Sequence, residues 1–326
     1  MSDDLTLPSL NADHQARLFG IFFPYAFRRL AEATASNRRL VYYTNADTAV
    51  SVIRNREVWM RKSSLMNDYR EIEHGVDCLS AAYSKSRERM QVVLDGMFPG
   101  LCGRLEERFD GWLPHFRTDT YIACASEHDD SEDKFGRLSM WRAYGGTTGV
   151  AIVLNGAPFF RPSDALKAYS SPIAYVDANG FEREFVAMIG SIEQNADFLK
   201  SAGEEVVISN LFSAFRYGIM STKHPGFHEE REWRVIYSPS FQKSDRLSTA
   251  IVSINGTPQS ICKIPLRDVP EEGLFGLELS ELIDRVIIGP TKFPVGICDA
   301  LIAVLTDAGV QNAASKVIVS DIPLRH

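Results

Sequence analysis

The final third of the chain holds several strand-like runs that follow one another through turns rather than through regular helices. The runs are REWRVIYS, STAIVSIN, SICKIPL and RVIIGP, and a helical pattern over residues 296–308 precedes a last strand-like run at residues 316–320. Parallel neighbours need long crossover connections, whereas antiparallel strands can be joined by turns. The sequence therefore predicts an α+β fold with a mainly antiparallel sheet, and it argues against a doubly wound fold.

The rest of the chain alternates strand-like runs with long helical patterns. Further strands are predicted at residues 39–44, 57–61, 120–126, 148–154 and 169–176, and helices at residues 13–36, 69–108 and 179–222, broken near Pro24, at residues 97–100 and near Gly203. We expect an N-terminal helical segment over residues 1–38. A single α+β domain follows over residues 39–326, with helical insertions near 69–115 and 179–222.

Composition and charge exclude several classes of protein. The 326 residues are 45% hydrophobic and 24% charged, which is ordinary for a globular chain. No apolar run is long enough to span a membrane and the polar start lacks a basic signal-like region, so we expect a soluble, cytoplasmic protein without a membrane partner. The net charge of −7 gives no global attraction to nucleic acid. The five scattered cysteines show no metal or disulfide spacing, so most are expected to be small buried hydrophobes.

The stretch GFHEEREWRVIY, residues 226–237, places three carboxylates at the start of a strand that otherwise suits burial. Side chains alternate between the two faces of an extended chain. We therefore expect Glu230, Glu232 and Arg234 on one face, and Arg231, Trp233, Val235 and Tyr237 on the packing face. This arrangement predicts a rigid polar site, although such an acidic cluster is also typical of a plain solvated surface.

Three further clusters are candidates for ligand contact. Tyr42 and Thr44 share a face near a strand end, where strand aromatics are usually core. Ser64 and Asn67 offer donors and acceptors for a sugar or an amide, although Asn67 or Asp68 also suits the cap of the following helix. Trp141 and Tyr144, three residues apart beside Gly145, suit either a core or a platform for a flat ring.

Motifs for other chemistries are absent from the sequence. His74, His128 and His228 have no metal-binding spacing with one another or with Asp129 and Asp130, so no metal site is predicted. No dinucleotide-fold, phosphate-loop or serine-hydrolase motif occurs either.

Taken together, these clusters resemble a broad bacterial family of uncharacterised proteins that is grouped with the ADP-ribosyltransferase-like fold. The motifs that carry the resemblance are VYYT with AVSVI, MND at residues 66–68 with Glu71, SMWRAYGG, EEREWRVIY, and IIGPTKFP with VSDIPLR. They extend over about residues 39–325. The resemblance implies a mainly antiparallel split sheet as the core.

ADP-ribosyltransferases combine a first strand with His-x-Thr or Arg, a middle element with Tyr or Ser, and a late strand with Glu-x-Glu. The resemblance puts Tyr42-Tyr43-Thr44 at the first element, Tyr144 at the second and Glu230-Arg231-Glu232 at the third. Tyr42 stands where the family has His, and no Ser-Thr-Ser run is present.

The resemblance further implies NAD as the substrate and a mono-ADP-ribosyltransferase, a transferase of the glycosyltransferase class. Glu232 would stabilise an oxocarbenium-like transition state through the ribose 2-hydroxyl, and Glu230 would orient or deprotonate the acceptor. Arg234 would balance charge or meet the diphosphate. Tyr144 is expected to be the third catalytic residue, beside Glu232 and Glu230. The remaining expected contacts to NAD are Tyr42, Tyr43, Thr44, Ser64, Asn67 and Trp141.

Many bacterial members of that fold act as toxins, so a toxin or phage-defence effector is implied, with a cognate antitoxin or another regulatory partner. The sequence leaves the acceptor open among protein side chains, nucleic acid and small molecules. Two alternatives also remain open. One is an NAD hydrolase or a nuclease on the same cleft, and the other is a catalytically silent module that senses a ligand or binds a protein.

Overall fold

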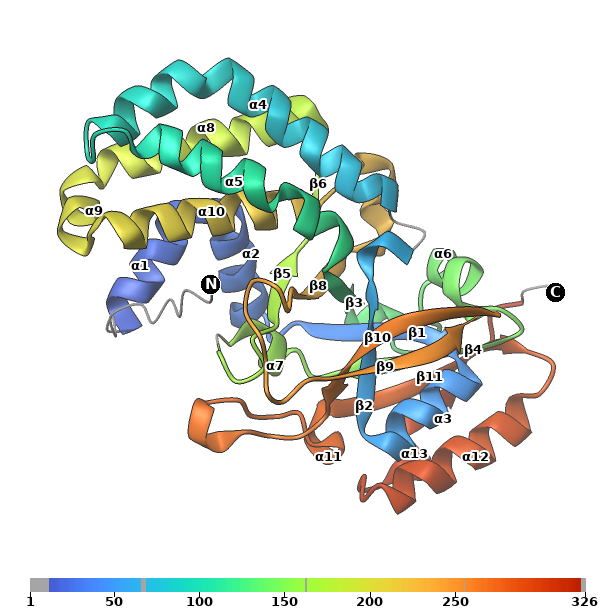
Figure 1. Cartoon of the computed structure of the whole chain (residues 1–326). Coiled ribbons are helices and arrows are strands. Elements are labelled where there is room, and N and C mark those ends of the chain that lie inside the picture. The colour runs from blue at the N-terminus through green and yellow to red at the C-terminus, as the bar shows by residue number, and fades with distance from the viewer. Residues whose placement is uncertain (1–11, 66–68, 162, 255, 324–326) are drawn as a thin grey trace. The chain divides into compact units, whose positions relative to one another are not determined.

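The computed structural model describes residues 12–65, 69–161, 163–254 and 256–323, and they form an α+β protein (Figure 1). The chain divides into two compact units. The helical unit comprises residues 1–31, 67–118 and 174–226, as far as they are described, and the sheet unit comprises residues 32–66, 119–173 and 227–326. The first part of the predicted N-terminal segment, as far as residue 31, and most of both predicted insertions thus fall into the same unit.

Long helices make up most of the helical unit. They are α1 (Ala12–Phe22), α2 (Pro24–Ala35), which continues into the sheet unit, α4 (Tyr69–Asp95), α5 (Leu101–Thr118), α8 (Ala178–Gln194), α9 (Ala196–Ala202) and α10 (Glu204–Met220). Two short strands, β6 (Ala174–Tyr175) and β7 (Thr222–Lys223), pair in parallel. The predicted breaks near Pro24, at residues 97–100 and near Gly203 are confirmed, and a further break at Asn195 was not predicted.

Aromatic side chains and one close helix contact hold the helical unit together. Phe109 of α5 packs edge-on to Phe215 of α10, with ring centroids 5.4 Å apart. At Gly75 of α4 an added Cβ would lie 2.2 Å from the carbonyl oxygen of Ile219. Only glycine therefore allows α4 and α10 to approach this closely. Among the described helices, none is both long and apolar enough to cross a bilayer.

The sheet unit is built on a mixed, mostly antiparallel sheet of ten strands. Its strands are β1 (Arg39–Asn45), β2 (Glu57–Lys62), β3 (Tyr121–His128), β4 (Thr148–Leu154), β5 (Tyr169–Pro172), β8 (Glu232–Tyr237), β9 (Ser248–Ile254), β10 (Thr257–Pro265), β11 (Ile283–Thr291) and β12 (Val317–Val319). Its helices are α3 (Ala46–Asn55), α6 (Leu138–Met140), α7 (Ala157–Phe160), α11 (Leu279–Leu282), α12 (Pro294–Asp307) and α13 (Ala313–Lys316). The predicted mainly antiparallel α+β class is confirmed, since the only parallel pair of this sheet in the described residues is β11 with β12.

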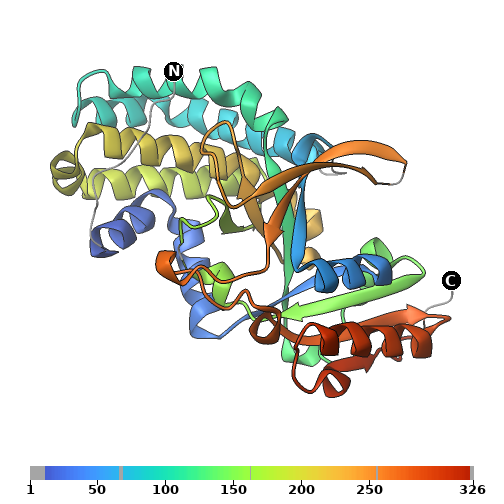
Figure 2. The same cartoon turned by 60° about the horizontal axis from the view of Figure 1, so that its bottom comes forward.

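The strand β3 has three neighbours, and this divides the sheet. β8 pairs along residues 121–126 of one edge, whereas the other edge pairs with β2 at residues 121–122 and with β1 at residues 126–128. β1 leads on to β4, β11 and β12, and β2 leads on to β10 and β9. The two arms therefore diverge from β3, as Figure 2 shows.

Side chains alternate between the two faces of the sheet, and the two faces pack against different core clusters. On the first, which we call the α3 face, Tyr42 packs with a core that includes Ile152 of β4 and Ile53 of α3. Helices α3 and α12 contact each other on this face (Figure 2). On the second, which we call the Trp141 face, Tyr43 packs with Trp141.

Candidate functional site

Glu232 begins β8, but Glu230 does not belong to that strand. Residues 225–230 form the 3-10 helix η4 (Pro225–Glu230), and Arg231 follows with φ +45°, in the left-handed region that side chains rarely adopt. The prediction that Glu230 shares a strand face with Glu232 and Arg234 is therefore wrong, because the extended backbone starts only after Arg231. The Glu232 and Arg234 part of the prediction is confirmed.

Glu232 and Arg234 form a buried ion pair along β8. Their exposed fractions are 6% and 2%, and Arg234 Nε donates to Glu232 Oε1 at 2.7 Å. Side chains two residues apart on a strand lie on the same face of the sheet, so the pairing of Glu232 with Arg234 follows directly from their spacing in the sequence. Burying two charges costs free energy unless they satisfy each other, and the short contact provides that compensation.

The strand register places Glu232 on the Trp141 face. Ser126 of β3 lies opposite Glu232 on one side and opposite Val41 of β1 on the other. Val41 belongs to the core cluster of Trp141, and directly opposite residues share a face. Ser126 is itself buried. It was not among the predicted site residues, because an apolar strand ending in one serine carries no signal until its neighbours are known.

Tyr42 and Thr44 lie on the other side of the sheet from Glu232. Opposite them in β4 stand Ile152 and Val150, both in the core of the α3 face. Burial raises the pKa of the Tyr42 hydroxyl, and a hydrogen bond with Thr44 opposes this in part. Tyr42 and Thr44 therefore occupy the face opposite to Glu232, whereas Tyr43 lies on the same face as Glu232.

Tyr144 and Glu230 meet at the surface. Tyr144 lies in a π-helical turn, η3 (Trp141–Gly145), and is 46% exposed. Its hydroxyl donates to Glu230 Oε1 at 3.3 Å. Two of the three residues predicted to be catalytic are thus brought together, although from the end of a 3-10 helix rather than from a strand. Single π-helical turns of this kind are frequent at functional sites.

Trp141 fills a narrow space between glycines. An added Cβ would lie 2.6 Å from its ring at Gly136 and 2.7 Å at Gly289. Its indole N–H donates to the carbonyl oxygen of Phe135 at 2.8 Å, and Tyr43 packs edge-on at 4.9 Å between centroids. Trp141 is therefore part of the core in this structure, the alternative that its helical spacing left open.

Arg137 connects the elements around Glu232. Its backbone N–H donates to the hydroxyl of Tyr43 at 2.8 Å, and burial raises the pKa of that hydroxyl to about 12. Its guanidinium donates to the carbonyl oxygens of Glu127 and Glu229, both at 2.7 Å. The three contacts fix β1, β3 and η4 relative to one another. Arg137 was not among the predicted site residues, since a lone arginine before a helical turn has no distinctive pattern.

A network of ion pairs surrounds the left-handed turn at Arg231. Its guanidinium contacts both Asp129 and Glu132, and Arg137 Nε donates to Glu132 at 3.0 Å. Burial tends to raise the pKa of Glu132, but the hydrogen bond and charge of Arg137 outweigh it, so the pKa lies below its usual value. These ion pairs stabilise the unusual backbone that precedes Glu232.

Of the two remaining predicted residues, Ser64 lies half-buried in the 3-10 helix η1 (Ser63–Leu65), and Asn67 lies outside the described residues. Within the described part of the chain, no group of three or more His, Cys, Asp or Glu side chains is arranged to hold a metal ion.

Comparison with known proteins gives one match. Residues 140–235 match the model of a protein family of unknown function, DUF2971. The matched segment is less than a third of the chain and contains Tyr144, Glu230, Glu232 and Arg234, but not β1. No curated protein and no solved structure matches the chain. The resemblance to an uncharacterised family is thus confirmed over this segment, and no comparison connects the chain to ADP-ribosyltransferases.

Proposed function

We propose that the protein is an NAD-dependent mono-ADP-ribosyltransferase-like enzyme in which Glu232 stabilises the transition state. The observation that carries the proposal is the buried ion pair of Glu232 with Arg234 at the start of β8. β8 is separated by a single strand, β3, from β1, which bears Tyr42-Tyr43-Thr44. The first and last elements of the family pattern therefore stand close in strand order. The division of the sheet at β3 is the feature that supports the split-sheet fold.

The chemistry assigns a distinct task to each residue. The bond between nicotinamide and the ribose breaks, and neutral nicotinamide leaves with the bonding electrons. A carboxylate that accepts a hydrogen bond from the ribose 2-hydroxyl binds more strongly as positive charge develops on the ring. Glu232 is assigned this role, and Arg234 holds its carboxylate in a fixed orientation through the 2.7 Å contact.

The acceptor then forms a bond to the same ribose carbon and gives up a proton. Glu230 is assigned as the base that takes this proton, because it is half-buried rather than sealed from solvent. Tyr144, which donates to Glu230 at 3.3 Å, is assigned to orient that carboxylate. The acceptor stays open among protein side chains, nucleic acid and small molecules, as does a role as a toxin or defence effector with a regulatory partner.

The test is incubation of the purified full-length chain with labelled NAD, measuring released nicotinamide and label attached to added protein, RNA or small amines. Glu232→Gln preserves shape and removes the charge, so we expect a rate loss of about 100-fold or more. Glu127→Gln is the matched control, because Glu127 is equally buried (7% exposed) but lies on the opposite face. Full activity in Glu232→Gln, with normal unfolding behaviour, would overturn the proposal.

A catalytically silent ligand-sensing or protein-binding module is the second candidate. It is favoured by Tyr42 and Thr44, which face away from Glu232 into the core of the α3 face. Thermal unfolding with and without NAD or ADP-ribose separates the two candidates. A shift in melting temperature without nicotinamide release, and without an effect of Glu232→Gln on that shift, would support the silent module.

A further inference from the structure

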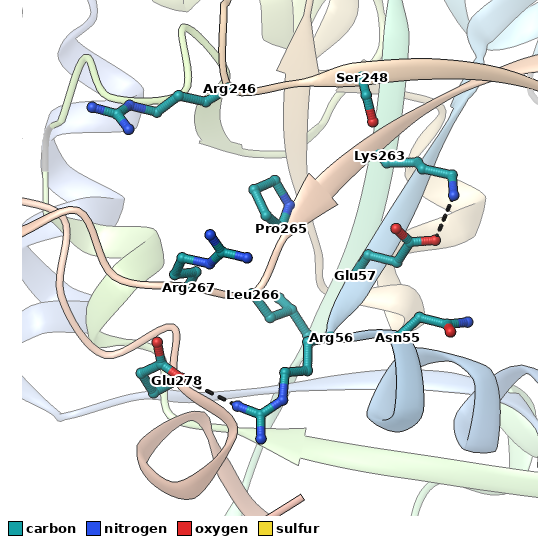
Figure 3. Close-up of a pocket in the computed structure, with 10 residues that line it drawn as sticks. All are labelled: Asn55, Arg56, Glu57, Arg246, Ser248, Lys263, Pro265, Leu266, Arg267 and Glu278. Atoms are coloured by element: carbon teal, nitrogen blue, oxygen red, sulfur yellow. Dashed lines mark hydrogen bonds and ion pairs between the residues drawn. The ribbon is translucent and has the colours of Figure 1, made fainter.

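A polar pocket of about 320 Å³ lies at the start of β2 and the end of β10 in the sheet unit (Figure 3). Residues from four segments line it: Asn55, Arg56, Glu57, Arg246, Ser248, Lys263, Pro265, Leu266, Arg267 and Glu278. All of them belong to the sheet unit, and none was assigned to the candidate site above. The pocket is therefore a separate site from the one that contains Glu232.

Cations outnumber acids around this pocket. The lining has three arginines and one lysine against Glu57 and Glu278. Pro265 and Leu266 are its only apolar members. The chain as a whole carries a net charge of −7, so this local excess of positive charge does not reflect its composition. Such a lining attracts an anion rather than an apolar ligand.

Most of these cations have acidic partners. Lys263 Nζ lies 2.8 Å from Glu57 Oε1, and Arg246 pairs with Glu271 and Glu272 outside the pocket. Arg56 makes only a long contact of 3.5 Å with Glu278 and donates to one backbone carbonyl oxygen. Since a guanidinium has five N–H donors, Arg56 keeps several for a ligand.

Arg267 differs from the other three. It is exposed, and it has no hydrogen bond or ion pair with any residue that the structure describes. Figure 3 shows it extending toward Pro265, whereas Arg56 and Lys263 are each joined to a glutamate. Arg267 therefore presents an exposed guanidinium at the pocket that no acid of the described residues neutralises.

We propose that this pocket binds the phosphoryl group of a small phosphorylated metabolite, with Arg267 as its main ligand. Guanidinium groups match phosphate oxygens in geometry and form paired, charge-assisted hydrogen bonds with them. Ser248 and Asn55 are available for hydroxyl groups on the body of the ligand. The volume lies at the lower end of the range for small-molecule sites, which fits a sugar phosphate. The proposal does not depend on the function assigned to Glu232.

The test is calorimetric titration of the full-length protein with ribose 5-phosphate at low salt, with ribose as the uncharged probe. We expect saturable binding of ribose 5-phosphate, none of ribose, and weaker binding as salt is raised. Arg267→Gln should weaken binding at least about tenfold, because it removes a charged donor pair. Arg267 has no partner among the described residues, so this variant is expected to fold as the original chain does.

Arg54→Gln is the matched control. Arg54 is also exposed, lies two residues before Arg56 and does not line the pocket. It should change the affinity less than about twofold, because screened charges outside the pocket contribute little. Absence of saturable binding up to about 10 mM ribose 5-phosphate would overturn the proposal. Equal losses in the Arg267 and Arg54 variants would also overturn it, since they would indicate unspecific attraction.

Discussion

Glu127 and Glu232 are two buried glutamates on neighbouring strands, and one accepts a hydrogen bond from a neutral donor whereas the other accepts one from a charged donor. Glu127, on the α3 face, accepts a hydrogen bond from the indole N–H of Trp233 at 3.0 Å, and that indole packs against Phe160. Glu232, on the Trp141 face, pairs with the guanidinium of Arg234. A neutral indole donor that packs against another aromatic ring thus contacts the first carboxylate. The second belongs to a charged row beside Ser126, so burial alone does not distinguish a structural acid from a candidate catalytic one.

The largest effect on stability is expected from Arg234→Met. Removing one partner of a buried ion pair leaves the other charge buried, which costs about 3–5 kcal/mol of unfolding free energy. Urea unfolding of the Arg234→Met variant measures this loss of unfolding free energy. Adding Glu232→Gln to this variant should restore part of the loss, because the unpaired charge is gone. A loss below about 1 kcal/mol would mean that the Glu232 carboxylate is well compensated without Arg234.

Trp233→Phe tests the hydrogen bond to the other buried glutamate, Glu127. It keeps an aromatic ring but removes the N–H donor to Glu127, so we expect a loss of about 1–3 kcal/mol by urea unfolding. Trp59→Phe is the matched control, since Trp59 also donates to a glutamate, Glu57, at 3.0 Å, but in a half-buried place. If both variants lost the same stability, the indole donor to Glu127 would have no special structural role.

A smaller, pH-dependent effect is expected at His128, which is 2% exposed beside Asp133. Burial lowers the pKa of His128 below its ordinary value, with the hydrogen bond to Asp133 opposing the shift. The unfolded chain therefore binds a proton that the folded chain resists, and stability falls as the pH drops below about 6.5. Unfolding between about pH 7.5 and 5.5 should show a smaller decline in His128→Gln. An identical decline in both proteins would contradict the assignment.

The smallest effect on stability is expected from Tyr144→Phe. The hydroxyl of this exposed side chain donates a surface hydrogen bond to Glu230, so its loss should change the unfolding free energy by less than about 0.5 kcal/mol. If the proposed function holds, the rate of NAD consumption should still fall, but by less than in Glu232→Gln. A large loss of stability would place Tyr144 with the structural residues instead.

Most strands and helices could be predicted from the sequence, because their signals are local. The run at residues 39–44 is an example, since β1 spans Arg39–Asn45. The three neighbours of β3 could not be predicted, since strand pairing depends on contacts far apart in sequence. For the same reason the chain gave no sign that its N-terminal segment and two insertions form one helical unit.

The candidate site was predicted in part. Alternation correctly put Glu232 and Arg234 together, because both lie inside a regular strand. It failed for Glu230, since nothing in EER signals that Arg231 adopts a left-handed backbone, which ion pairs with Asp129 and Glu132 stabilise from elsewhere in the chain. It also could not reveal that Ser126 stands opposite Glu232, because that depends on the register of two separate strands.

The interleaving of the two units along the chain has a practical consequence. Each unit is assembled from three stretches, so no single cut in the sequence releases either one intact. A truncation within residues 1–31 removes part of the helical unit only, and one within residues 227–326 removes part of the sheet unit only. Isolated expression of the helical unit would need its three pieces rejoined by new linkers. During synthesis, moreover, neither unit can be completed before the ribosome has passed residue 226, which delays productive folding until late in translation.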